Sequence, residues 1–152
     1  MKQLVVGVVL LMATVVGCSS LALQPADFSW AAEEAITVDG KGMADAQRYA
    51  VSFSVKPLFL AELADSSAWK DATVRVIRDK SGMYFIAAPK FKNVYVFASG
   101  YGKLSLEKKI LISETAPMAD PKFNQRDSYI ELLNGKEKLR LTQNGILQGG
   151  QK

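Results

Sequence analysis

Apolar and polar side chains alternate along much of this chain, which is the pattern of half-buried β-strands. The clearest case is Arg48–Lys56, where one parity is apolar and the other is polar or small; the apolar members are Tyr49, Val51, Phe53 and Val55. Pro57 follows directly and either ends this strand or places it at the edge of a sheet. The pattern predicts a strand with one buried face and one solvent-exposed face.

A second alternating segment spans Lys103–Ser113. Its apolar residues share one parity, with Lys108 as the single polar residue among them: Leu104, Leu106, Ile110 and Ile112. In a regular strand, residues of one parity point to the same side, so all four apolar residues should share a face. We therefore expect one long strand with a single apolar face.

Three turn sequences join strands into successive hairpins, and Gly82 is expected to be left-handed. In the first hairpin, the turn Asp79–Gly82 joins strands at 73–78 and 83–88. In the second, Ser99–Gly102 joins strands at 93–98 and 103–112. In the third, Asn134-Gly135 joins strands at 129–133 and 136–142. A two-residue Asn-Gly loop predicts a type I′ turn. In that register Ile130 faces Leu139 and Glu131 faces Lys138. Together the three hairpins predict a meander.

The remaining segments are less regular. Asp27–Val38 and Arg48–Lys56 could form a hairpin across 39–46, although Ala-Ala-Glu-Glu at 31–34 suits a helix equally well. Leu58–Lys70 is expected to be a short helix or an irregular turn. Pro117 and Pro121 indicate a loop over residues 114–127.

Together these patterns predict an all-β, mainly antiparallel fold: a single-domain β-sandwich or small barrel with a hairpin meander and room for one short helix near residues 58–70. The domain is expected over residues 27–148, followed by a frayed tail at 149–152. A chain of this length buries about two thirds of its unfolded surface as one domain.

The N-terminus has the parts of a secretory signal. Lys2 precedes a 13-residue apolar run, Leu4–Val16, and the sequence Val15-Val16-Gly17-Cys18 contains the only cysteine of the chain. The run alone is shorter than the about 20 residues that span a bilayer. An uncleaved anchor extending to Leu23 and ordinary cleavage after Ala22 are the alternatives.

Val15-Val16-Gly17-Cys18 resembles the lipobox of bacterial lipoprotein precursors. The resemblance implies a signal peptide at 1–17, a diacylglyceryl group on the sulfur of Cys18 and an N-acyl chain on its amine, followed by a lipidated tether at 18–26. Two or more chains anchor a protein stably in a membrane. The implied location is the cell envelope, and Ser19 after the cysteine favours the outer membrane, facing periplasm or cell surface, in a Gram-negative host.

Charge is unevenly distributed. Residues 18–69 carry three basic and seven acidic side chains, whereas residues 70–152 carry fifteen basic and eight acidic ones. A basic half can attract anionic lipid, but lysines also decorate solvent faces and protect strand edges. The sequence lacks the basic clusters typical of nucleic-acid binding, and no nucleic-acid partner is expected.

The chemistry available to the chain is narrow. It has no histidine, and lipidation would consume its one thiol, so we expect no enzyme, metal or cofactor beyond the lipid on Cys18. Ser67–Lys70 and Ser105–Lys108 both fit S-x-x-K, without the partner motifs of penicillin-recognising enzymes. Asp120, Asn124 and Asp127 lack calcium-loop spacing.

Part of the predicted meander is similar to transthyretin-like sandwich modules. Asp79, Gly82 and Tyr84 match their D-x-x-G-x-Y turn, and Gly100-Tyr101 matches a later Gly-Tyr pair. The similarity covers only 72–113, and Lys92-Asn93 stands where these modules have Pro-Gly. It implies a binding or structural module.

Aromatic residues gather around the central hairpins: Tyr84, Phe85, Phe91, Tyr95, Phe97 and Tyr101. They could form a surface for lipid or a partner, or they could pack the core. We expect a membrane-anchored, non-catalytic envelope interaction or assembly module, with a carrier of a hydrophobic ligand such as lipid as the alternative. An enclosed apolar cavity above about 300 Å³ favours the carrier, and an open apolar patch or strand edge favours the interaction module.

Overall fold

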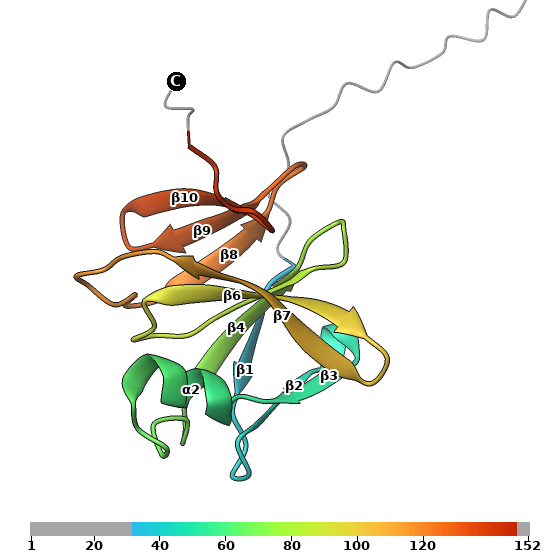
Figure 1. Cartoon of the computed structure of the whole chain (residues 1–152), viewed down its shortest axis with the longest axis vertical. Helices are drawn as coiled ribbons and strands as arrows, with labels where there is room; N and C mark the ends of the chain where they lie inside the picture. Colours follow the sequence, from blue (N-terminus) through green and yellow to red (C-terminus); the bar gives the residue numbers. More distant parts are fainter. Residues whose placement is uncertain (1–31, 149–152) are drawn as a thin grey trace, which may run out of the picture.

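The structure, a computed structural model, describes residues 32–148, which form three antiparallel sheets and one α-helix (Figure 1). The predicted signal peptide at 1–17, the lipidation site Cys18, the tether at 18–26 and the tail at 149–152 lie outside the described residues. All the sheets are open. The mainly antiparallel β fold with one short helix is confirmed, and the closed-barrel alternative is wrong.

The largest sheet has five strands in the order β1-β4-β5-β6-β7: Glu34–Thr37, Thr73–Arg78, Tyr84–Ala87, Asn93–Gly100 and Lys103–Leu111. The second has four strands in the order β11-β10-β9-β8: Gly145–Ile146, Glu137–Thr142, Ile130–Asn134 and Pro121–Gln125. The third is a hairpin of β2 (Met43–Ala46) and β3 (Val51–Ser54), joined by a 3-10 turn, η1 (Gln47–Tyr49).

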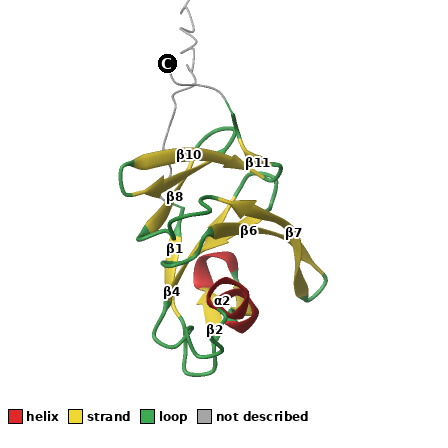
Figure 2. Ribbon diagram, turned by 60° about the vertical axis from the view of Figure 1, so that its left-hand side comes forward, coloured by secondary structure: helices red, strands yellow, loops and turns green. Residues whose placement is uncertain are grey.

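The central part of the five-stranded sheet is covered on both faces. The four-stranded sheet lies on one side and α2 (Lys56–Leu63) on the other (Figures 1 and 2). Every residue of β5 is therefore buried. Phe85 pairs with Ile77 and Val96 and faces the four-stranded sheet, whereas its neighbour Ile86 faces the α2 side.

Two adjacent glutamates tie the layers together. The Glu33 carboxylate lies 2.6 Å from Arg75 Nη1 and accepts the backbone N–H of Phe123 in β8. The Glu34 carboxylate accepts the backbone N–H groups of Gln47 and Arg48 in η1, each at 3.1 Å. Adjacent residues of an extended chain point to opposite faces. One glutamate therefore fixes the four-stranded sheet, and the other fixes η1.

Helix α2 confirms the short helix expected near 58–70, although it begins earlier, at Lys56. Pro57 occupies the first turn, where its missing N–H costs no hydrogen bond. Leu58 and Phe59 are buried, and a left-handed Ala64 ends the helix. No helix within residues 32–148 is long and apolar enough to cross a membrane.

The pairing predicted for the N-terminal strands is wrong. β1 pairs with β4, so that Ile36 lies opposite Val74, and β3 pairs with β2. The cause is a tight reversal after β1, in which Asp39 Oδ1 accepts the N–H groups of Lys41 and Met43 at 2.8 Å. The chain therefore turns before residue 44 and begins a separate hairpin.

The turn between β4 and β5 is confirmed, with Gly82 at a φ of 93°. The turn between β6 and β7 is also confirmed. The predicted β9–β10 register is wrong: Asn134 pairs with Glu137, which leaves Gly135-Lys136 as the loop and places Ile130 opposite Leu141. Glycine supplies the positive φ of 63° at the first loop position, but Lys136 at the second position has no positive φ, so the predicted type I′ turn is also wrong. The shift is two residues, so the buried face is unchanged.

A β-bulge divides β7. Phe97 pairs with Leu106 but Val96 pairs with Lys108, which leaves Glu107 as an extra residue. Leu106 consequently shares the α2 side with Phe97, whereas Ile110 pairs with Val94 on the opposite face. The single apolar face predicted for this strand is wrong.

The segment around the prolines also differs from the expected loop, because its C-terminal part is strand β8. Pro121 is the first residue of β8, and β8 is an edge strand. That is a position where proline, which lacks an N–H, is tolerated in a sheet. Phe123 and Gln125 alternate into the interior.

Candidate functional site

The six aromatic residues singled out in the sequence do not form one surface. Phe85 and Phe91 are completely buried, and Tyr84 packs edge-on against Tyr49 in the core. Tyr101 is fully exposed at the β6–β7 turn. Only Tyr95 and Phe97 line a common hollow.

That hollow, the apolar groove, has a volume of about 460 Å³ and lies on the α2 side of the five-stranded sheet. Its lining is mostly apolar and comes from β3, α2, β5, β6 and β7: Phe53, Ser54, Pro57, Leu58, Ala61, Ile86, Tyr95, Phe97, Leu104 and Leu106. Leu106 is 54% exposed. The groove is therefore open to solvent.

A second hollow of about 540 Å³ adjoins the apolar groove and shares Phe53, Ser54 and Leu104 with it. It lies between β3 and the turn end of the β6–β7 hairpin. Among the described strands, β3 pairs with β2 alone and β7 with β6 alone. Each therefore presents an edge whose backbone N–H and C=O groups have no partner strand.

The bulge at Glu107 explains why the groove has an apolar wall on β7. Without the extra residue, Leu104 and Leu106 would face the same side as Ile110, which packs in the core. With it, both leucines lie on the groove side beside Phe97. The sequence shows the apolar parity but gives no clear sign of the bulge.

One wall of the groove is fixed by Glu62 of α2, whose side chain is only 2% exposed. Its carboxylate accepts hydrogen bonds at 2.7 Å from the Lys92 N–H, Asn93 Nδ2 and the Tyr95 hydroxyl. Lys109 Nζ lies 3.8 Å from the same carboxylate and 5.5 Å from the centre of the Tyr95 ring. These contacts hold α2 against β6.

Burial, with the hydrogen bond from Tyr95 to Glu62 and the negative charge of that carboxylate, raises the pKa of Tyr95 well above its usual value of 10.0. The phenol therefore stays protonated and keeps donating to Glu62. The ring is held as a rigid apolar wall of the groove.

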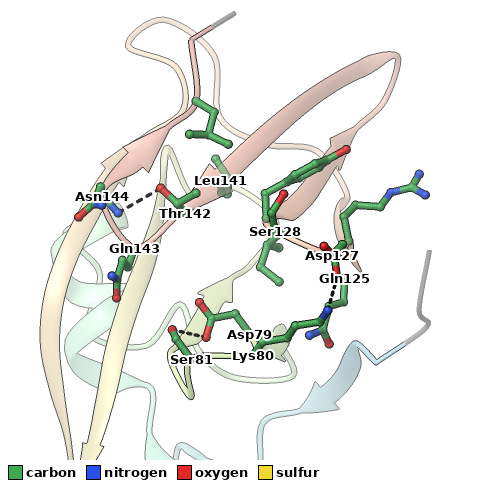
Figure 3. Close-up of a pocket in the computed structure, with 14 residues that line it drawn as sticks. Asp79, Lys80, Ser81, Gln125, Asp127, Ser128, Leu141, Thr142, Gln143 and Asn144 are labelled. Carbon is green, nitrogen blue, oxygen red and sulfur yellow. Dashed lines mark hydrogen bonds and ion pairs between the residues drawn. The ribbon is translucent and has the colours of Figure 1, made fainter. Parts of the chain in front are cut away.

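A second site, the polar cleft, has a volume of about 470 Å³ and is formed by three turns (Figure 3). It lies where the β4–β5 turn meets the four-stranded sheet, and its lining is Asp79, Lys80, Ser81, Gln125, Arg126, Asp127, Ser128, Tyr129, Ile130, Leu141, Thr142, Gln143, Asn144 and Leu147. Lys80 Nζ lies 2.5 Å from Asp127 Oδ1 across it. The Ser81 hydroxyl donates to Asp79 Oδ1 at 2.7 Å.

Gln125 is the most buried polar side chain of this cleft, with 8% of the residue exposed. Figure 3 places it beside the Lys80–Asp127 pair. Within the described part of the chain, its side-chain amide makes no hydrogen bond. Sequence reasoning missed this cleft because its residues come from three distant turns, each of which reads as ordinary turn polarity.

The remaining candidates from the sequence are dispersed. The Ser67 hydroxyl donates to Asp65 Oδ1 at 2.8 Å. Asp120 lies 3.1 Å from both Lys122 Nζ and Arg75 Nη2, and the Asn124 amide donates to Glu131. Asp127 pairs with Lys80, so the three side chains do not share a partner. Residues 32–148 contain no group of three or more acidic, histidine or cysteine side chains that could hold a metal ion.

Comparison with known proteins found no matching family model, no matching curated protein and no matching solved structure.

Proposed function

We propose that this protein is a lipid-anchored, non-catalytic module of the bacterial cell envelope that docks a partner protein through its apolar groove. The observation that carries the proposal is the openness of the groove. Leu106 in its lining is 54% exposed, and the adjoining hollow lies beside the unpaired edge of β3. An open apolar surface beside a strand edge suits an extended apolar segment of another protein.

The anchor rests on the sequence Val15-Val16-Gly17-Cys18. Acyl chains on Cys18 would hold the domain at the membrane, and Ser19 favours the outer membrane. A tether of eight residues, 19–26, reaches at most about 28 Å. The groove would therefore meet partners close to the membrane surface.

The alternative is a carrier of a hydrophobic ligand such as lipid. It is favoured by the volume of about 460 Å³ and the mostly apolar lining, both typical of small-molecule sites. A carrier would be expected to enclose its ligand, however, and Leu106 leaves this site open. The open geometry favours the partner protein.

The proposal is tested by crosslinking in intact cells, followed by mass spectrometry of captured proteins and of lipid that copurifies with the protein. The expected result is a defined protein partner in a fixed ratio to this chain. Recovery of a stoichiometric lipid without any protein partner would support the carrier and rule out the docking module.

The anchor is tested separately with Cys18→Ala. This change is expected to abolish incorporation of labelled fatty acid, because it removes the sulfur that would carry the diacylglyceryl group. Incorporation equal to that of the unchanged protein would exclude lipidation at this position.

A further inference from the structure

We propose that the polar cleft binds a neutral carbohydrate, independently of the apolar groove. The first argument is the charge of the lining. It contains two acidic residues, Asp79 and Asp127, and two basic ones, Lys80 and Arg126, so that it has no net charge. A site without net charge does not favour a small ion over a neutral polar ligand.

The charged side chains of the lining also have partners within the protein. Lys80 pairs with Asp127 at 2.5 Å, and Arg126 Nη2 lies 3.1 Å from Glu131. The Asp79 carboxylate accepts from the Ser81 hydroxyl and from the Met83 N–H. These ion pairs and hydrogen bonds shape the walls of the cleft.

Gln125 supplies the group that points to a ligand. The residue is only 8% exposed, and its amide lines the cleft and makes no hydrogen bond within residues 32–148. The amide is therefore available to pair with water or with a ligand in the cleft. A primary amide presents a donor and an acceptor side by side. Two hydroxyl groups on neighbouring carbons of a sugar offer the matching acceptor and donor.

The rest of the lining fits the other features of a sugar. The backbone and side chains of Ser128, Gln143 and Asn144 add polar groups at the mouth, while Ile130 and Leu141 form an apolar floor. A sugar ring has hydroxyl groups at its edge and C–H groups on its faces, so it can satisfy both. The volume of about 470 Å³ lies within the usual range of small-ligand sites.

The test titrates the full chain in detergent micelles with three neutral trisaccharides: cellotriose, maltotriose and the trimer of N-acetylglucosamine. Inorganic phosphate serves as the charged probe. Isothermal calorimetry gives the affinity, and ¹⁵N-detected NMR follows the glutamine side-chain amides. The expected result is saturable binding of at least one trisaccharide, with a shift of the Gln125 amide signals and weaker or no binding of phosphate.

Two variants locate the site. Gln125→Ala removes both hydrogen-bonding groups and is expected to weaken sugar binding about tenfold or more. Gln143→Ala changes an exposed residue at the mouth and is expected to weaken binding severalfold, so it decides the matter should Gln125→Ala fail to fold. Tyr101→Ala, fully exposed and remote from the lining, is the matched control and should bind like the unchanged protein.

Three outcomes would overturn the proposal. They are no trisaccharide binding at millimolar concentration, binding of phosphate in preference to every sugar, and sugar binding that neither cleft variant weakens. Because none of these outcomes involves the apolar groove, the proposed docking function stands or falls separately.

Discussion

The apolar groove and the polar cleft are nearly equal in volume, about 460 and 470 Å³, but opposite in chemistry and origin. The groove is built by strands and a helix, whose periodicity places apolar side chains on one side. The cleft is built by three turns, where polar residues collect for local reasons. Regular elements thus supply a surface for hydrophobic partners, whereas turns supply hydrogen-bonding groups.

Both sites depend on the five-stranded sheet between them, and Phe85→Ala is expected to have the largest effect. The ring is completely buried, so its loss should lower the free energy of unfolding by about 3–5 kcal/mol. Urea unfolding measures the change, with Tyr101→Ala as a control expected to lie within about 0.5 kcal/mol of the unchanged protein. A decrease in the free energy of unfolding below about 1 kcal/mol would show that packing of the five-stranded sheet at Phe85 does not support the two sites.

Glu62→Gln in the groove wall should lower the free energy of unfolding more than Asp127→Asn in the polar cleft. It removes the buried charge that accepts from the Lys92 N–H, Asn93 and Tyr95, and is expected to cost about 1–3 kcal/mol of unfolding free energy. Asp127→Asn, in the exposed pair with Lys80, should cost no more than about 0.5 kcal/mol. If urea unfolding shows that both variants lose the same free energy of unfolding, the buried Glu62 contacts do not stabilise the fold more than the exposed Lys80–Asp127 pair.

Tyr95 gives the groove wall a dependence on pH. Its folded-state pKa is raised above the usual 10.0, so above pH 10 the unfolded chain loses this proton while the folded chain keeps it. The stabilising contribution of Tyr95 is therefore complete below that pH and declines above it. Tyr95→Phe should be less stable than the unchanged protein at about pH 8, and the gap should narrow by about pH 11. If urea unfolding shows that the stability difference between Tyr95→Phe and the unchanged protein widens with pH, the pKa of Tyr95 is not raised in the folded state.

Leu106→Asp should have the smallest effect on the fold and a clear effect on docking. Leu106 is 54% exposed, so the free energy of unfolding should change by about 0.5 kcal/mol or less. A charge in the groove should nevertheless abolish capture of the partner in cells. Tyr101→Asp adds the same charge at an exposed position outside the lining and should leave capture unchanged. Loss of capture in both variants would argue against a docking site in the groove.

The sequence predicted local features better than their assembly. The antiparallel class, the short helix and the turn at Gly82 follow from periodicity and from residue types with strong backbone preferences. The pairing of β1 with β4 depends on contacts between distant segments, which no local pattern encodes. The bulge at Glu107 was also missed, because alternation shows parity but not the insertion of one unpaired residue.

The sites were predicted only in part for the same reason. Tyr95 and Phe97 share a parity on β6 and line one hollow, but the sequence grouped them only by the density of aromatic residues around the hairpins. Phe85 and Phe91 were grouped with them by density in the sequence alone, yet they face the core. Gln125 carries no signal of its own, since its unpaired amide becomes visible only when three turns converge.

The most direct test of the docking proposal is site-specific photocrosslinking in intact cells from position 106 in the apolar groove and from position 128 in the polar cleft. We expect position 106 to yield a discrete protein adduct that position 128 and the exposed position 101 do not yield. Lipid adducts alone from position 106, or the same protein captured from all three positions, would contradict the assignment of the groove as the partner surface.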